Sequence, residues 1–267
     1  MQIADFLDAE TARIDALMTK KRSLVELLHE RLRSDQIRIS CGRTLGYGVR
    51  PSGHDWLGHI PSHWPVERLK YVARLESGHT PSRSNEVLWM DCRIPWVTLN
   101  DVGYLQTHEY VDETVNLISA QGLAASSARV LSAGTVVLSR DATVGRCGIL
   151  AVPMATSQHF VNWICSESLR PRFLWLLFRW AMQTHFDALT AGATLKTIGM
   201  PDVKRMVVPV PPVEEQDRIV AEADTLRSRA TKALYNLDHQ IKLLHERRQA
   251  LITAAVTGEM EVPGVPK

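Results

Sequence analysis

The stretch Leu27-Leu28-His29-Glu30-Arg31 near the start of the chain returns as Leu243-Leu244-His245-Glu246-Arg247 near its end, 216 residues later. In the same register Ile3, Asp8 and Arg13 match Ile219, Asp224 and Arg229. This period is far too long for a solenoid protein, whose units repeat every 20 to 50 residues or so. We therefore expect two similar segments that bracket one middle domain.

Both repeated segments show the spacing of long amphipathic helices. Apolar residues recur every three, four or seven positions, with Glu10 and Lys21 as polar interruptions in the first segment. Such a narrow stripe is typical of a helix that packs against another helix. The predicted interface residues are Leu7, Ile14, Leu17, Leu24 and Leu28 in the first helix and Leu226, Leu237, Leu244 and Leu251 in the second.

Proline, glycine and acidic residues divide the chain into parts. Pro211 and Pro212 precede Glu214 and Glu215, which place negative charge where the dipole of a starting helix favours it. Five glycines and prolines between Gly42 and Gly53, with few apolar residues, indicate a linker. The predicted parts are an N-terminal coiled-coil helix over 1–39, a linker over 40–54, a middle domain over 55–212, a C-terminal coiled-coil helix over 213–258 and a tail over 259–267.

The middle domain carries signals for both strands and helices. Residues 134–139 and 148–152 are predicted as buried strands on either side of a turn, and 207–210 as a short last strand. Residues 172–186 predict a core helix, whose aromatic side chains favour packing over base stacking. The predicted fold class is therefore α+β, with one mixed α/β domain flanked by two long coiled-coil helices that pair antiparallel.

Composition favours a cytoplasmic protein without a membrane segment. The 267 residues are 45% hydrophobic with a formal net charge of +2, and no apolar run is long enough for a signal peptide or a membrane span. The four cysteines, at 41, 92, 147 and 165, lack C-x-x-C spacing, so we expect reduced thiols and neither a zinc site nor disulfides. The eight basic residues between Lys20 and Arg50 fit either a solvated helix face or a strip that faces phosphates.

The sequence lacks the motifs of the common enzyme classes. It contains no Walker loop, no G-x-G-x-x-G, no H-E-x-x-H, no G-x-S-x-G and no N-P-P-Y or D-P-P-Y segment of adenine methyltransferases. His29 and His245 lie inside the repeated helices, where a surface or interface role is expected. We therefore expect a chain that is not an enzyme and that holds no metal.

An ordered set of short motifs carries a family resemblance. The motifs are Trp64-Pro65, Gly78-His79-Thr80-Pro81-Ser82, Ile94-Pro95-Trp96-Val97, Gly134-Thr135-Val136-Val137-Leu138, Ala142-Thr143-Val144-Gly145, Thr156-Ser157-Gln158 and Val210-Pro211-Pro212. In this order, and with both helices, they resemble a target recognition domain of the specificity subunit of type I restriction-modification systems. The match covers nearly the whole chain, with 42–53 the least informative part.

The resemblance implies recognition of DNA without chemistry. It implies that the chain selects a sequence in double-stranded DNA for adenine methylation and cleavage, and that it scaffolds methyltransferase (modification) subunits beside a restriction/translocase subunit. S-adenosylmethionine, ATP and Mg are then expected in those partners and no cofactor in this chain. The candidate DNA-binding residues are His79, Thr80, Ser82, Arg83 and Asn85 in one loop, Arg140, Thr143 and Arg146 in a second, and Thr194 and Lys196 in a third.

The chain departs from the family plan because it holds one recognition domain where a full specificity subunit has two. We therefore expect a half-sized subunit, either encoded as such or cut from a longer one, and a homodimer that reads an inverted-repeat target. Two alternatives remain open. The first alternative is a coiled-coil oligomerisation or scaffold protein, which DNA binding by the middle domain would exclude. The second is a divergent DNA nuclease or methyltransferase, which DNA binding without turnover would exclude.

Overall fold

The computed structural model describes residues 2–192 and 196–259, which fall into two compact units. One unit comprises residues 2–35 together with 224–259, and the other comprises residues 36–223. In the described part of the chain, no helix combines the length and the apolar character needed to cross a bilayer.

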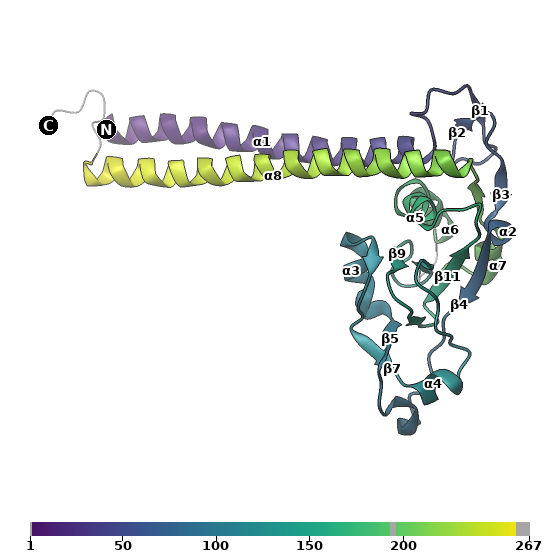
Figure 1. Cartoon of the computed structure of the whole chain (residues 1–267). Coiled ribbons are helices and arrows are strands. Elements are labelled where there is room, and N and C mark those ends of the chain that lie inside the picture. The colour runs from purple at the N-terminus through teal and green to yellow at the C-terminus, as the bar shows by residue number, and fades with distance from the viewer. Residues whose placement is uncertain (1, 193–195, 260–267) are drawn as a thin grey trace. The chain divides into compact units, whose positions relative to one another are not determined.

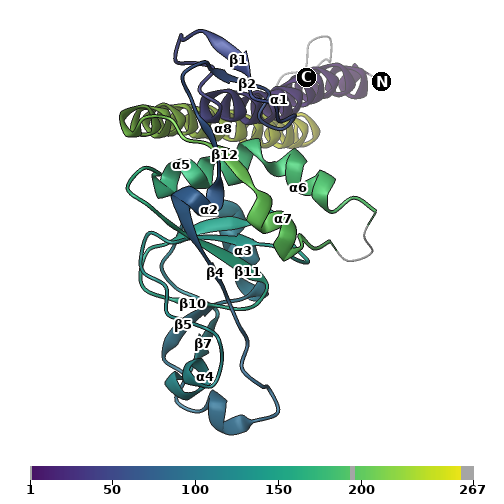
Figure 2. The same cartoon turned by 90° about the vertical axis from the view of Figure 1, so that its right-hand side faces the viewer.

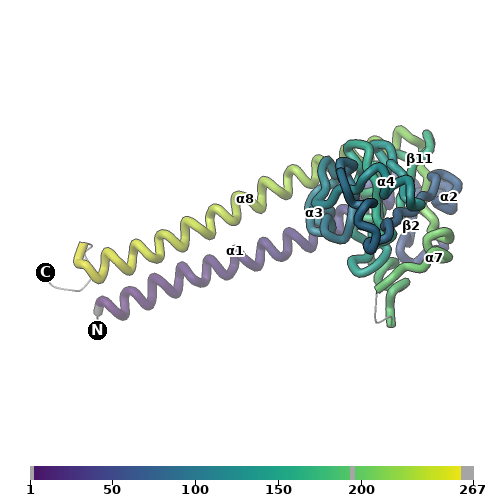
Figure 3. Tube along the Cα trace, turned by 90° about the horizontal axis from the view of Figure 1, so that it is seen from below, coloured from purple at the N-terminus to yellow at the C-terminus, as the bar shows by residue number. Residues whose placement is uncertain are grey.

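Two long helices, α1 (Gln2–Ser40) and α8 (Val213–Thr257), lie side by side, and the first unit contains residues 2–35 of α1 and 224–257 of α8 (Figures 1 and 3). Lys21 Nζ donates to Gln240 Oε1 at 2.6 Å, and Asp15 Oδ1 lies 3.0 Å from Arg248 Nε. The contact residue with the higher number in α1 therefore pairs with the residue of lower number in α8. The helices pair antiparallel, which confirms the predicted fold class.

The register of the contact differs from the prediction at two positions. Leu17 and Leu24 are 44% and 50% exposed and lie outside the contact between the helices. The less exposed side of the helix here carries Met18, which is buried, and Lys21 and Val25, which are partly buried. Lys21 is therefore not an interruption, because a lysine stem can lie in such a contact while its ammonium reaches a polar partner. The other predicted interface residues are buried or partly buried: Leu7, Ile14, Leu28, Leu226, Leu237, Leu244 and Leu251.

The second unit is built from short elements. Its helices are α2 (Leu69–Val72), η1 (Glu86–Trp89), η2 (Leu99–Asp101), α3 (Val102–Thr107), α4 (Ala120–Ala124), α5 (Pro171–Leu176), the π-helical turn η3 (Leu177–Ala181), α6 (Gln183–Leu189) and α7 (Met200–Arg205). Its strands are β1 (Val49–Pro51), β2 (His59–Pro61), β3 (Val66–Arg68), β4 (Ala73–Ser77), β5 (Ile94–Val97), β6 (Tyr110–Val111), β7 (Asn116–Ile118), β8 (Val136–Ser139), β9 (Cys147–Leu150), β10 (Ala155–Thr156), β11 (Phe160–Cys165) and β12 (Val207–Pro209).

A five-stranded sheet in the order β4-β11-β8-β9-β6 forms the centre of this unit. Every residue of β8 and β9 is buried, and α5 packs against both strands. This burial explains the uninterrupted apolar runs that predicted the two strands. A smaller sheet, β10-β5-β7, lies with α4 at the end away from α5 (Figure 2).

The predicted core helix is interrupted but buried. Residues 172–186 form α5, η3 and most of α6, and Phe173, Trp175 and Phe178 are at most 4% exposed. These aromatic side chains therefore pack in the core and do not form a base-stacking platform.

The predicted linker over residues 40–54 is wrong, because this segment is part of the folded unit. Strand β1 pairs antiparallel with β2, and the Arg43 guanidinium donates to two backbone carbonyl oxygens at 2.9 and 3.1 Å. Gly42 is buried at φ 69°, and a Cβ there would lie 2.2 Å from Cη2 of Trp64. Glycine serves close packing here, and composition alone does not distinguish that role from flexibility.

Candidate nucleic-acid interface

Three of the predicted binding segments meet at one place in the second unit. They are the loop after β4, the loop between β8 and β9, and the stretch before α7. The backbone N–H of Ala142 donates to the Lys196 carbonyl at 3.0 Å, and that of Ile198 donates to the Arg140 carbonyl at 2.7 Å. The second and third segments are therefore held together by backbone hydrogen bonds.

The loop after β4 joins them through residues 156–160. The His79 N–H donates to the Thr156 carbonyl at 3.0 Å. A Cβ on Gly78 would lie 2.1 Å from the Ser157 carbonyl oxygen, so only glycine permits this approach. Thr80 Oγ1 then donates to Oε1 of Gln158.

Arg140 clamps the segments together. Its Nε donates to the Gln158 carbonyl at 3.3 Å and its Nη1 to the Ile198 carbonyl at 3.2 Å. The side chain is partly buried. Arg140 was predicted as a DNA contact, but these bonds give it a role in holding the site's shape.

Sequence reasoning missed three residues at this place. Gln158 is exposed, and its Nε2 lies 3.3 Å from Nε2 of His159. His159 Nδ1 lies 2.7 Å from Oδ1 of Asp141. The signal was available, because Gln158 and His159 are a polar pair between two buried strands, β10 and β11. We call Thr80, Arg140, Asp141, Gln158, His159 and Lys196 the loop cluster.

The remaining predicted DNA-binding residues are not part of the loop cluster. Thr143 is partly buried, with Oγ1 3.1 Å from Ser139 Oγ, and Arg146 is partly buried beside β9. Ser82, Arg83 and Asn85 are exposed near η1, and no hydrogen bond among the described residues joins their side chains to the loop cluster. Thr194 lies outside the described residues.

The basic stretch of residues 20–50 is partly used inside the unit. Arg50 Nη2 donates to the Trp64 carbonyl at 2.6 Å and its Nε to the Ser62 carbonyl at 3.2 Å. Together with Arg43, this guanidinium stabilises the β1–β2 hairpin.

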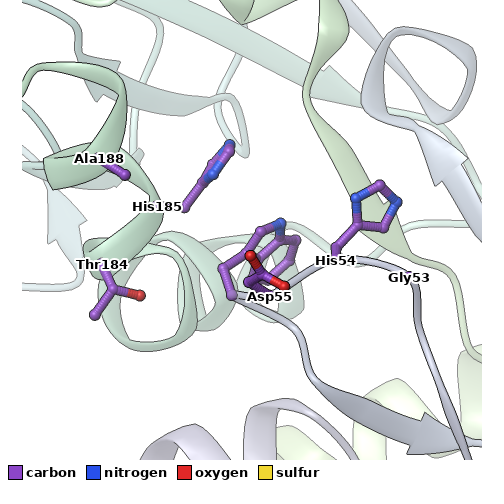
Figure 4. Close-up of a pocket in the computed structure, with 7 residues that line it drawn as sticks. Gly53, His54, Asp55, Thr184, His185 and Ala188 are labelled. Atoms are coloured by element: carbon purple, nitrogen blue, oxygen red, sulfur yellow. The ribbon is translucent and has the colours of Figure 1, made fainter.

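A separate cavity of about 460 Å³ lies between the β1–β2 loop and α6 (Figure 4). It is lined by Gly53, His54, Asp55, Trp56, Thr184, His185 and Ala188. Burial, and then the charge of His54, lower the pKa of His185, while Asp202 opposes them. Within the described residues no group of three His, Cys, Asp or Glu side chains is placed to hold a metal ion.

The four cysteines are free thiols. Cys41 and Cys147 are buried, and Cys92 and Cys165 are partly buried. Burial raises the pKa of Cys41 to about 11 and that of Cys147 to about 12. Neither thiol is therefore a nucleophile at neutral pH.

Comparison with known proteins gives a consistent match. The family model described as type I restriction modification DNA specificity domain matches residues 61–243. The chain is 27% identical over 164 residues to the type I restriction enzyme MjaIX specificity subunit of Methanocaldococcus jannaschii, which covers 61% of this chain and 38% of that protein. It is 24% identical over 136 residues to the HindI specificity subunit of Haemophilus influenzae, which covers 51% of this chain and 29% of that protein.

Solved structures share the fold. A chain from a structural study of complex assembly and conformational transition of the type I R-M system matches with a TM-score of 0.64 and 20% identity, over 93% of this chain and 58% of that one. The HsdS subunit from Thermoanaerobacter tengcongensis matches with a TM-score of 0.59 and 19% identity, over 93% and 57%. This chain thus spans less than two thirds of each relative.

Proposed function

The chain belongs to the family of type I restriction modification DNA specificity domains, and from that premise we propose that it is the sequence-specific DNA recognition subunit of a type I restriction-modification complex. In this role it selects the target for adenine methylation and cleavage by partner subunits and performs neither reaction. The loop cluster is the observation that carries the proposal, since it gathers polar side chains and the exposed Lys196 from separate segments. Polar side chains read base edges and cations bind phosphates.

The direct test is a selection from randomised DNA duplexes by the full chain together with its methyltransferase partner. We expect a defined motif, and the same motif should carry methyladenine in cells that express this chain and lose it when the chain is deleted. Equal affinity for all duplexes in the presence of the partner would contradict a specificity role.

The helices supply a surface for the methyltransferase subunits. Leu27 and Leu243 occupy equivalent places in the repeat and are 60% and 48% exposed. Because the two helices are antiparallel, the repeat relates these leucines by an approximate two-fold axis. Two equivalent apolar patches fit two copies of one partner. Replacing either leucine by Asp should remove one methyltransferase copy per chain, whereas replacing the exposed Glu26 by Ala should remove none.

The chemistry and its cofactors belong to the partners in this proposal. S-adenosylmethionine serves the methyltransferase subunits, and ATP and Mg serve the restriction/translocase subunit. The assembly works in the cytoplasm, where it meets DNA. Purified alone, the chain should bind double-stranded DNA without consuming either cofactor.

The active assembly holds two copies of this chain. One recognition domain addresses one half-site, and a two-fold homodimer presents two identical readers in opposite orientation. The target should then be an inverted repeat with half-sites about one helical turn apart, roughly 10 to 10.5 base pairs between centres. Sedimentation of the complex with the methyltransferase checks this. One copy per complex with an asymmetric motif would exclude the dimer.

A further inference from the structure

We propose that Gln158 reads an adenine through the major-groove edge of the base, and that His159 and Asp141 set the direction in which its amide points. This inference rests on the proposed function, and it names a residue and a base that the function alone does not specify. The chemistry of the three side chains carries it.

Gln158 combines an exposed side chain with a fixed backbone. Its neighbours Ser157 and Phe160 are 1% and 0% exposed. The carbonyl oxygen of Gln158 accepts a hydrogen bond from Arg140 Nε at 3.3 Å. The backbone N–H of Arg140 donates to the carbonyl of the next residue, His159, at 2.9 Å. A side chain that reads a nucleotide base needs a rigid backbone beneath it, because a shift of the side chain by about 1 Å is enough to lose the contact.

The tautomer of a neutral His159 side chain follows from its partner. His159 Nδ1 lies 2.7 Å from Asp141 Oδ1. An ionised carboxylate can only accept hydrogen bonds, so Nδ1 carries the proton. In the neutral imidazole the other nitrogen, Nε2, is then an acceptor. Asp141 thereby selects the tautomer of His159.

That tautomer selects the orientation of the Gln158 amide. The atom 3.3 Å from His159 Nε2 must be a donor, which is Nε2 of Gln158. The reversed amide would place its oxygen against the lone pair of the imidazole. On the other flank, Thr80 Oγ1 donates to Gln158 Oε1. The contacts with His159 and Thr80 therefore agree on one orientation.

The remaining capacity of the amide matches one base. A glutamine amide has two N–H donors and two acceptor lone pairs. His159 uses one donor and Thr80 uses one lone pair, which leaves one N–H on Nε2 and one lone pair on Oε1. Adenine offers an N7 acceptor beside an N6 donor in the major groove, whereas guanine offers two acceptors there. Among single bases, only adenine satisfies both free sites of Gln158.

Lys196 adds a cation to the segment of the chain that is hydrogen-bonded beside Asp141. Its carbonyl accepts from Ala142, one residue after Asp141, and its side chain is exposed with no hydrogen bond or ion pair to another described residue. A phosphate contact next to a base contact fixes the register of reading.

The test uses the full chain with its methyltransferase partner and the duplex motif selected by the wild-type complex. Gln158→Ala should lose discrimination at a single A·T position by roughly 5- to 150-fold, the range for one bidentate contact. Preference at all other positions should stay. Gln121→Ala, at an exposed glutamine on α4, is the matched control and should leave every position unchanged.

An atomic probe sharpens the assignment. With 7-deazaadenine at that position, N7 is replaced by carbon while base pairing is kept. This base should weaken binding by the wild type and leave the affinity of Gln158→Ala unchanged. Gln158→Glu, which has only acceptors, should shift the preference from adenine towards cytosine, whose N4 is a donor.

Asp141→Asn tests the positioning role. The asparagine amide can donate to Nδ1 of His159, which places the imidazole proton on Nε2 and reverses the Gln158 amide. We expect lost preference at the same A·T position with nearly unchanged affinity for unrelated DNA, whereas a merely structural loss would weaken binding to all sequences alike. Retained preference at every position in Gln158→Ala overturns this inference and leaves the proposed function intact. A wild-type complex without any sequence preference overturns the proposed function itself.

Discussion

Trp64 and Glu215, 151 residues apart in the chain, are joined by a buried hydrogen bond in which the indole Nε1 donates to the carboxylate Oε2 at 2.8 Å. His63 Nε2 lies 3.0 Å from the other oxygen, Oε1. Trp64 is 0% and Glu215 is 8% exposed. Since Glu215 lies in the first turn of α8, this contact ties the beginning of that helix to the segment between β2 and β3.

Replacing Glu215 by Gln should lower the free energy of unfolding by about 2 kcal/mol, in the range for hydrogen bonds to a charged group. Burial of the carboxyl acts to raise its pKa, but the hydrogen bonds from Trp64 and His63 outweigh burial, so the pKa lies below the ordinary 4.5. The carboxylate therefore adds stability above pH 4.5, and that stability disappears as the pH falls through the lower, folded-state pKa.

Urea unfolding at about pH 7 and about pH 3 checks this, since the difference between wild type and Glu215→Gln should shrink in acid. Glu214→Gln, at the exposed neighbouring position, should change little at either pH. A difference that stays constant with pH would contradict the role given to the carboxylate.

Gly42→Ala should destabilise the second unit by about 2 to 3 kcal/mol, because the new Cβ would lie 2.2 Å from Trp64 Cη2 on a backbone with φ 69°. Gly46→Ala is the matched control, since Gly46 has φ 77° but no atom within 4 Å of a Cβ. Its loss should be limited to the backbone strain of about 1 to 2 kcal/mol. Equal losses in thermal unfolding would mean that Trp64 moves aside at no cost.

The same glycine shows why part of the fold was predictable and part was not. The long helices repeat one spacing over 39 and 45 residues, so the pattern is redundant and survives local exceptions such as Lys21. Residues 40–54 contain no such redundancy. Whether Gly42 lies in a flexible linker or under an indole depends on where Trp64 is, and that is a property of the tertiary structure.

Ile14→Asp should separate the two helices of the first unit, whereas Leu17→Asp should not. Ile14 is 5% exposed in the contact between α1 and α8, and Leu17 is 44% exposed. A charge buried among apolar side chains costs several kcal/mol, and an exposed charge costs little. Circular dichroism at 222 nm during thermal unfolding measures this. Similar melting of both variants would contradict the observed register and restore the predicted one, in which Leu17 lies in the contact.

The site was predictable at the level of segments and not of single residues. The three loops were identified because polar and glycine-rich stretches interrupt buried strands, as around Thr80 and Lys196. The assignment of Arg140 to DNA failed to anticipate that its guanidinium holds the Gln158 carbonyl. The role of His159 depends on its distance from Asp141, and a proton position set by such a partner cannot be read from spacing.

Acid should destabilise the second unit partly through His185. Burial and the charge of His54 lower the pKa of His185 from its ordinary 6.5. The unfolded chain therefore binds a proton more readily than the folded chain, and stability falls as the pH drops from 6.5 towards the folded-state pKa. His185→Asn should lose less stability than the wild type between about pH 7.5 and about pH 5. His79→Asn, at an exposed histidine, controls for the number of titrating groups. An equal loss of unfolding free energy in acid for wild type and His185→Asn would refute the prediction.

Lys196 and Arg140 should differ in what their removal does to DNA binding. Lys196 is exposed, so Lys196→Ala should weaken binding to all DNA sequences alike. The slope of log affinity against log salt concentration should become shallower by about 1, which is the value for one phosphate contact. Arg140 donates to the carbonyl oxygens of Gln158 and Ile198. Arg140→Ala should therefore loosen the segment that carries Gln158, and reduce preference for the selected motif more than affinity for unrelated DNA. Titrations of the complex on motif and unrelated duplexes at several salt concentrations separate the two effects. If Arg140→Ala instead lowered both affinities equally with the same change in salt slope, Arg140 would be a phosphate contact and not a clamp.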